Sequence, residues 1–204
     1  MHNLHMHEKT TTDEKTTTSS LNNTFSAMDS SNKDQWMAIG HETSKNQPRV
    51  AQSILTMLNS LKDIVDGFSV DQLTHSLQTA TRAEEDKAEP QMIVAALCHD
   101  IGKAISVANH AQIAAEILRP YVDEDVYNVI RTHQEFQGRH YFEYFGGNPD
   151  AREGYRDEAW FSTGETFADK WDQNSFDPTY PTQPLSHFEP LIRQTFAKPK
   201  RSFG

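Results

Sequence analysis

The most apolar helix that the sequence predicts, over residues 91–100, ends in an adjacent histidine and aspartate, His99-Asp100. Apolar side chains occur nearly all round this helix, so we expect it to lie at the centre of the fold. Burying His99 and Asp100 there without a counter-charge would be costly, and a bound metal ion is the natural compensation. This pair constrains the fold strongly, because other segments must then supply the remaining ligands.

The other apolar residues recur at intervals of three and four, which is the spacing of one helix face. Pro90 suits the first turn of the central helix, Gly67 suits a helix end, and Ser69 is the expected N-cap of the next helix. No segment shows sustained alternation of apolar and polar residues. The sequence therefore predicts an all-α helical bundle, with further helices over residues 50–65, 70–80, 109–118, 123–136, 157–161, 163–173 and 185–196.

Residues 1–48 have a different composition from the rest of the chain. Eleven of the fifteen positions from Thr10 to Thr24 are Ser, Thr or Asn. Such a stretch buries too little apolar surface to offset its conformational entropy. We therefore predict a disordered polar tail over residues 1–48, compatible with a short ordered piece around Trp36, and one catalytic bundle over residues 49–204.

The charge and the cysteine content exclude several classes of protein. The formal net charge is −10 and no basic stripe is present, which argues against nucleic acid as a partner. The single cysteine, Cys98, excludes an intramolecular disulfide and suits a reducing compartment. No apolar run approaches the roughly 20 residues of a membrane span. We expect a cytoplasmic monomer or small homo-oligomer that binds neither nucleic acid nor a membrane.

The chain has ten histidines, an unusual number for a protein with few other cations. His75 precedes His99 by 24 residues, and His133 follows His110 by 23. Antiparallel neighbouring helices that point their side chains at one centre would give this repeated interval. The tail holds four histidines, and we expect two more to lie outside the ligand set: His2, His5, His7 and His41 in the tail, and His140 and His187 in the bundle.

The order of these residues resembles the signature of the HD-domain superfamily, His…His-Asp…Asp on a helical bundle. His75, His99-Asp100 and a later aspartate match it, and the additional pair His110 and His133 is similar to the two-metal branch. The resemblance covers about residues 50–195. Within that branch the chain is similar to HD-domain di-iron oxygenases of organophosphonates and, more distantly, of myo-inositol. The similar strings are residues 70–75 (VDQLTH), 97–103 (LCHDIGK), 110–115 (HAQIAA), 171–172 (WD), 176–178 (FDP) and 184–188 (PLSHF).

The resemblance implies a mixed-valent Fe(II)/Fe(III) pair that Asp100 bridges. It assigns His75, His99, Asp100 and Asp172 to one iron, and Asp100, His110 and His133 to the other. Asp169, one turn before Asp172, competes for the place of the last ligand. The implied reaction is oxidative: the hydroxyl and a phosphonate oxygen of a 1-hydroxyalkylphosphonate chelate one iron, and O₂ binds the other. The C–P bond then breaks to give phosphate and a carboxylate.

The same resemblance suggests which residues contact the substrate. Lys103 matches a substrate-contacting position and is the expected catalytic lysine, Arg139 is a second candidate cation, and Gln137 stands where a relative has a lysine. Val65 and Phe68 replace a tyrosine and the glutamate that binds a primary amine. A quaternary ammonium needs aromatic faces instead, and the candidates for such a cage are Phe68, Tyr141, Phe142, Tyr144, Phe145 and Trp160.

The expected substrate is therefore 1-hydroxy-2-(trimethylammonio)ethylphosphonate, which would yield glycine betaine and phosphate. A hydroxymethylphosphonate without an amine also fits. The main alternative is a two-metal HD-domain phosphohydrolase or phosphodiesterase that acts on a phosphate ester or nucleotide. One group of cyclic-dinucleotide phosphodiesterases shares His-Asp-Ile-Gly-Lys but has a Gly-Tyr-Pro signature, whereas this chain has Gly138-Arg139-His140-Tyr141. A third alternative is a regulatory HD module without turnover.

Overall fold

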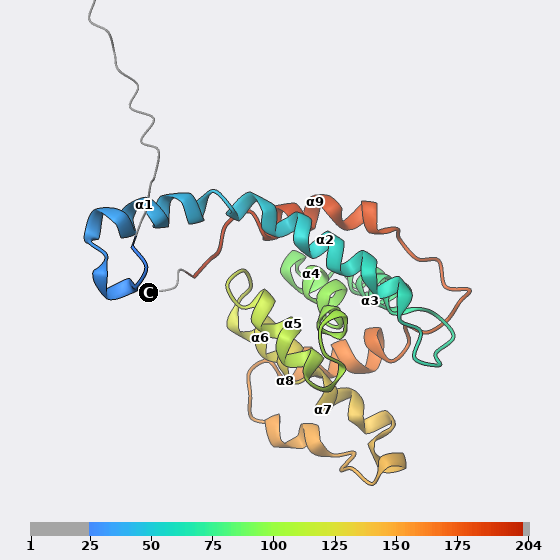
Figure 1. The fold of residues 1–204 in the computed structure, drawn as a ribbon. Coiled ribbons are helices and arrows are strands. Elements are labelled where there is room, and N and C mark those ends of the chain that lie inside the picture. Colours follow the sequence, from blue (N-terminus) through green and yellow to red (C-terminus); the bar gives the residue numbers. More distant parts are fainter. Residues whose placement is uncertain (1–24, 202–204) are drawn as a thin grey trace, which may run out of the picture. The chain divides into compact units, whose positions relative to one another are not determined.

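The computed structural model describes residues 25–201, and these residues form helices joined by turns, with no strand among them (Figure 1). They belong to two compact units, one ending at Lys45 and the other beginning at Asn46. The predicted all-α class is confirmed. None of the described helices is both long enough and apolar enough to span a membrane.

The first unit contains η1 (Met28–Ser30) and α1 (Lys33–Ser44). Asn32 caps α1 in a reciprocal capping box, in which its side chain accepts from the backbone of Gln35 and the Gln35 side chain accepts from the backbone of Asn32. The ordered piece expected around Trp36 is therefore a helix that extends over residues 33–44. The larger part of the predicted tail, residues 1–24 with His2, His5 and His7, lies outside the described residues.

The second unit begins with a helix whose buried positions follow the predicted spacing: Ala51, Ile54, Leu55 and Leu58. In chain order the elements are η2 (Gln47–Arg49), α2 (Val50–Ser60), η3 (Leu61–Asp63), α3 (Gln72–Glu85), α4 (Pro90–Cys98), η4 (Ile101–Ala104), η5 (Val107–Asn109), α5 (His110–Leu118), α6 (Glu124–Arg131), α7 (His133–Gln137), η6 (Gly138–His140), η7 (Phe142–Phe145), η8 (Ala151–Tyr155), α8 (Phe161–Thr166), η9 (Phe167–Asp172) and α9 (Leu185–Thr195).

Helix α4 is the centre of this unit. Every residue from Met92 to Cys98 is buried, and α4 contacts α3, α6 and α9. Helix α9 also lies beside α2, whereas the short helices α7 to η8 lie on the opposite side of the unit (Figure 1). The predicted central helix therefore holds His99 and Asp100 at its buried end.

Local hydrogen bonds shift two predicted helix boundaries. Asp71, not Ser69, caps α3, because its two carboxylate oxygens accept from the backbone N and the hydroxyl of Thr74, both at 2.8 Å. The helix predicted over 123–136 breaks at Thr132, whose hydroxyl donates to the carbonyl of Asn128 at 2.8 Å. Residues 157–160, predicted as helical, form turns. The break at Thr132 places His133 at the start of a new helix.

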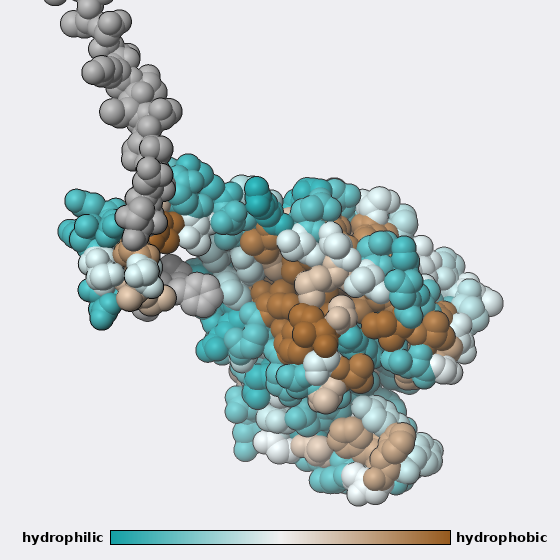
Figure 2. Space-filling model, viewed as in Figure 1, coloured by the Kyte–Doolittle hydropathy of each residue, from teal (hydrophilic) through white to brown (hydrophobic). Residues whose placement is uncertain are grey.

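On the face seen in Figure 2, hydrophilic side chains surround a group of apolar side chains gathered near α5. Ile105, Ile113 and Ile117 line a shallow groove there, and Ile105 and Val107 are more than half exposed. No predicted ligand lines this groove, so it is separate from the histidine centre.

Candidate metal centre

The structure brings four histidines together, and all four rings use the same nitrogen to bond the backbone. In each ring Nδ1 lies within hydrogen-bond distance of a backbone carbonyl oxygen: Ser175 for His75 (3.0 Å), Ala96 for His99 (2.7 Å), Val107 for His110 (2.8 Å) and Ile130 for His133 (2.7 Å). A carbonyl can only accept, so Nδ1 carries the proton and Nε2 presents a lone pair. Four lone pairs therefore point toward one centre.

Three of these four histidines lie at the ends of helices. His99 follows the last residue of α4, and His110 and His133 are the first residues of α5 and α7. Each ring donates to the carbonyl three residues earlier in the chain, at a place where backbone carbonyls are not all used by the helix. Local backbone geometry thus fixes these three rings.

Asp100 lies between two groups of histidines. Its Oδ1 is 3.1 Å from Nε2 of His110 and 3.6 Å from Nε2 of His133. Its Oδ2 is 3.5 Å from the Nε2 atoms of both His75 and His99. The two oxygens of one carboxylate therefore face two different sets of nitrogen atoms, as a bridging ligand must.

Asp172 completes the set around His75 and His99. Its Oδ1 lies 3.1 Å from Nε2 of His75 and 3.5 Å from Nε2 of His99. The two Nε2 atoms are themselves only 3.1 Å apart, and both present lone pairs. Such an arrangement of acceptors alone is repulsive unless a cation lies among them.

All six side chains are buried, His110 being the most accessible at 5%. Burial by itself raises the pKa of the Asp100 carboxyl, but His99, His110, His133 and Lys103 together hold that pKa well below its ordinary value. Burial opposes ionisation of Asp172 in the same way, and the adjacent His99 and His75 lower its pKa. Both carboxylates are therefore anionic ligands at neutral pH.

The donor set fits metal ions. Donor atoms of His75, His99 and Asp172 lie within 4.8 Å of one another, and so do those of His99, Asp100 and His133. Within the described residues, Nε2 of His110, Nε2 of His133 and Oδ2 of Asp172 are buried without a hydrogen-bond partner. Imidazole nitrogen and carboxylate oxygen suit iron, zinc and similar divalent metals.

Comparison with known families agrees with this geometry. Residues 73–173 match the HD domain. The chain contains an HD domain. The matched segment begins just before His75 and ends just after Asp172, so it includes all six side chains of the centre. An HD domain implies a metal-dependent enzyme. No curated protein matches the chain.

Asp169 and Asp172 lie on different faces of the helix η9. Spacing in an α-helix would put them on one face, but η9 is a π-helix, with a wider turn. Asp172 therefore faces His75, whereas Asp169 contacts Arg152 at 2.9 Å and His140 at 3.0 Å. Of the two competing aspartates, the structure brings only Asp172 into the centre.

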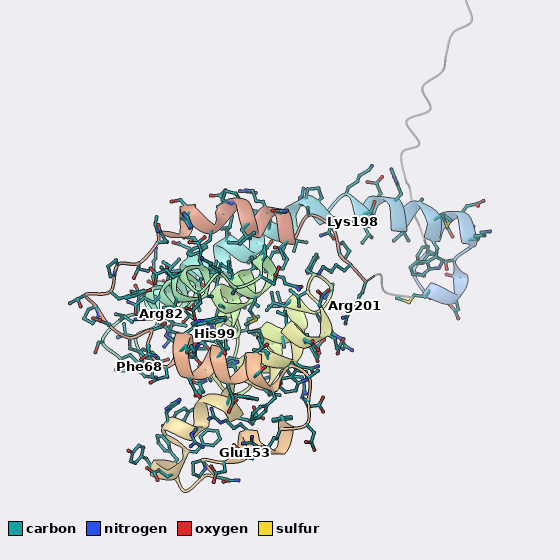
Figure 3. All side chains as sticks on the ribbon, turned by 180° about the vertical axis from the view of Figure 1, so that it is seen from behind. Phe68, Arg82, His99, Glu153, Lys198 and Arg201 are labelled. Carbon is teal, nitrogen blue, oxygen red and sulfur yellow. The ribbon has the colours of Figure 1, made fainter. Side chains whose placement is uncertain are left out.

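A cavity of about 520 Å³ opens onto the centre of the HD domain. Of the six side chains of the centre, three reach its wall: His75, Asp100 and His110. The other lining residues that the sequence predicts as substrate contacts are Phe68, Lys103, Gln137, Tyr141 and Phe145. Figure 3 shows His99 inside the bundle and Phe68 nearer its edge, and the lining residues Phe68 and Phe145 are exposed.

Sequence reasoning did not predict Gln134, Gln173 or Phe176 as cavity residues. Gln134 lies one helical turn before Gln137 on α7, so the same-face rule could have identified it. Phe176 stacks on His75 with ring centroids 4.3 Å apart, and on Phe68 at 4.4 Å. The three rings form one stack from the centre to the cavity edge.

Several predicted substrate contacts lie elsewhere. Arg139 does not line the cavity, because its exposed side chain extends from the turn η6 to Asp150, 3.4 Å away. Trp160 is 4% exposed and packs in the core against Phe136 and Tyr155. Phe142 and Tyr144 also lie outside the lining. Of the six aromatic residues predicted for a cage, Phe68, Tyr141 and Phe145 line the cavity, and Phe176 lines it as well.

Proposed function

We propose that the HD domain is a di-iron oxygenase that cleaves the C–P bond of 1-hydroxy-2-(trimethylammonio)ethylphosphonate. The observation that carries the proposal is the position of Asp100, whose two oxygens face separate histidine groups at the wall of an aromatic cavity. This arrangement supports a dinuclear centre open to a small substrate. The substrate and O₂ are the partners of the protein in this proposal.

His75, His99 and Asp172 would hold one iron, His110 and His133 the other, and Asp100 both. When bound, the iron pair supplies Lewis acidity for the hydroxyphosphonate and one-electron chemistry toward O₂. The protein keeps the four imidazoles in the Nε2-coordinating tautomer through their bonds to backbone carbonyls. Their burial keeps bulk water away from the reacting atoms.

Lys103 supports recognition of an anion beside the centre. Its Nζ lies 2.7 Å from Oδ2 of Asp100 and donates to Oε1 of Gln72 at 3.0 Å, so the charge is held at the cavity wall. An ammonium has three donors, and the third remains for a phosphonate oxygen. The role of Lys103 in the proposal is to bind and orient that oxygen.

The cavity wall also supports a quaternary ammonium. Among the described residues that line it, Asp100 is the one carboxylate, and its oxygens already face histidines and Lys103. A primary ammonium would therefore lack a free carboxylate partner. A trimethylammonium group needs aromatic faces instead, which Phe68, Tyr141 and Phe176 offer. Burial and the nearby carboxylates raise the pKa of Tyr141 to about 12, so its phenol stays neutral.

The proposed reaction balances with one O₂ per substrate. The C1–H and C–P bonds break, one oxygen atom enters the carboxylate of glycine betaine, and the other enters phosphate. Two protons leave C1 and its hydroxyl, of which one is carried by hydrogenphosphate and one is released. Carbon and phosphorus supply the four electrons that reduce O₂.

Metal analysis and O₂ uptake test the proposal. The full-length protein is loaded anaerobically with Fe(II) and partly oxidised, and we expect two irons per chain with a mixed-valent EPR signal. Substrate should then release phosphate in step with O₂ consumption. Phosphatase activity with Mn²⁺ or Mg²⁺, without O₂ and without iron-dependent turnover, would instead identify the hydrolase alternative.

The substrate itself is tested by a series of three 1-hydroxyphosphonates that carry an amino, a trimethylammonio or no group at C2. We expect the highest kcat/KM for the trimethylammonio compound, because its methyl groups cover the aromatic wall. Equal turnover of the primary amine would contradict the assignment of the aromatic residues, while leaving the oxygenase reaction intact.

A further inference from the structure

His140 lines the same cavity as the metal centre but belongs to neither group of candidate ligands. Its Nε2 lies 3.0 Å from Oδ1 of Asp169, which is not a lining residue. The carboxylate therefore stands behind the imidazole as seen from the cavity. Since a carboxylate accepts, Nε2 carries a proton, and Nδ1 has no hydrogen-bond partner within the described residues.

Arg152 holds Asp169 in turn. Its Nη1 contacts both carboxylate oxygens of Asp169, at 2.9 and 3.0 Å, and its Nη2 lies 3.5 Å from Glu165. Arg152 is 5% exposed, and a guanidinium is placed in such a site only when it is paired. The chain from Arg152 through Asp169 to His140 joins η8, η9 and η6, three separate elements that fix the imidazole.

The lysine and arginine near the cavity have different environments. Lys103 is paired with Asp100 and has one donor left for an anion, whereas Arg139 pairs with Asp150 and does not line the cavity. His140 is therefore the lining imidazole whose carboxylate partner is shared with a buried arginine. Arg152, Asp169 and Glu165 together carry one net negative charge, which an imidazolium at His140 would balance while Nδ1–H stays available to an anion.

We propose that His140 is a substrate-binding residue that donates its Nδ1–H to a phosphonate oxygen, with Asp169 and Arg152 as positioning residues. The choice of phosphonate as the anion rests on the proposed function. The inference goes beyond that function, because it adds to Lys103 a second anion-binding side chain, one that forms no hydrogen bond or ion pair with the six residues of the centre and is positioned by its own carboxylate and arginine.

The test measures the Kd of methylphosphonate for the full-length, iron-loaded protein by isothermal titration calorimetry under anaerobic conditions. We expect His140→Ala to raise Kd at least about tenfold, since a charge-assisted hydrogen bond is lost. His187→Ala is the matched control: His187 also pairs with a carboxylate, Glu84 at 2.9 Å, but does not line the cavity. The Kd of His187→Ala should lie within about twofold of the wild-type value.

A double-mutant cycle separates positioning from general structure. Asp169→Asn should raise Kd in the wild-type background and leave it unchanged in the His140→Ala background. Equal effects in both backgrounds would overturn the positioning role. Metal content and thermal unfolding of each variant show whether it is folded, and His140→Lys, which restores a cation, should recover part of the affinity in a folded protein.

The outcomes distinguish this inference from the proposed function. If the protein oxidises no hydroxyphosphonate but His140→Ala still weakens methylphosphonate binding, the function is wrong and the anion site stands. If hydroxyphosphonates are oxidised and His140→Ala binds methylphosphonate as the wild type does, the anion site is wrong. Absence of any methylphosphonate binding by the wild type also overturns the inference.

Discussion

Nζ of Lys103 lies 2.7 Å from Oδ2 of Asp100, the oxygen that also faces the Nε2 atoms of His75 and His99. The Lys103 charge is thus tied to the candidate bridging carboxylate and reaches the cavity wall as well. Lys103→Met keeps most of the side-chain volume and removes the charge. We expect kcat/KM for the hydroxyphosphonate to fall about a hundredfold with little change in bound metal.

Lys62→Met is the control for this variant, because Lys62 lies exposed in η3 and does not line the cavity. Steady-state kinetics and metal content are measured for both proteins. A Lys103→Met variant with at least half of the wild-type kcat/KM would show that the lysine does not contact the reacting substrate.

Variants of Asp100 and of His133 should retain different numbers of metal ions. Asp100 faces both histidine groups, so Asp100→Asn should lose both ions, whereas His133→Ala should retain one near His75. Metal per chain, measured by mass spectrometry after anaerobic loading, checks the prediction. Two ions per chain in Asp100→Asn would contradict the bridging role, and His187→Ala should bind metal as the wild type does.

Gly102 is needed for the position of His110. A Cβ at Gly102 would lie 2.2 Å from the carbonyl oxygen and 2.7 Å from Cα of His110, and backbone atoms at a helix start cannot turn aside as a side chain can. Gly102→Ala should therefore displace His110, lower the metal content and destabilise the fold by about 1–3 kcal/mol. Gly154→Ala, where nothing lies within 4 Å, is the matched control in metal analysis and thermal unfolding.

Phe176 should discriminate between substrates by their charge. It stacks on Phe68 at the cavity wall, and a cation above such a face gains about 0.5–2 kcal/mol. Phe176→Leu should raise KM for the trimethylammonio compound by a factor of about 2–30, in line with this range, and leave KM for the unsubstituted compound nearly unchanged. Because Phe176 also stacks on His75, Phe176→Tyr should keep both KM values near wild type. An equal rise for both substrates would indicate a role in packing alone.

The thiol of Cys98 should be inert in the native protein. The residue is fully buried in α4, and burial raises the pKa of its thiol to about 12. A disulfide reagent at pH 8 should titrate no thiol in the native protein and one thiol per chain in guanidinium chloride. Rapid reaction without denaturant would mean that the end of α4 opens readily, which its position beside His99 makes unexpected.

The sequence predicts much of the fold because the buried helices follow regular spacing. The α2 residues Ile54 and Leu58 and the apolar run of α4 lie in the core as their pattern indicates. The exceptions arise from local hydrogen bonds that the apolar pattern does not encode. The Asn32 capping box stabilises α1 although that helix buries no residue, and Thr132 divides a predicted helix into α6 and α7.

The candidate centre is predictable to the extent that it depends on residue order. His75, His99-Asp100, His110, His133 and Asp172 meet in the structure, and their order in the chain carries that information. The set of residues that line the cavity outside the metal centre depends on the direction of each side chain, which the sequence does not give. Trp160 packs into the core, Arg139 turns outward to Asp150, and the π-helical turn separates Asp169 from Asp172.

The bond from His75 to the carbonyl of Ser175 spans 100 residues, whereas His99, His110 and His133 bond carbonyls three residues away. During synthesis on the ribosome, three of the imidazoles can acquire their orientation as soon as their own helix ends form. His75 must wait until Ser175 has been made and the chain has closed over it, and Asp172 emerges only shortly before. Of the two groups of ligands, the one that contains His75, His99 and Asp172 is therefore completed last, although His75 is the first of the six residues to be synthesised.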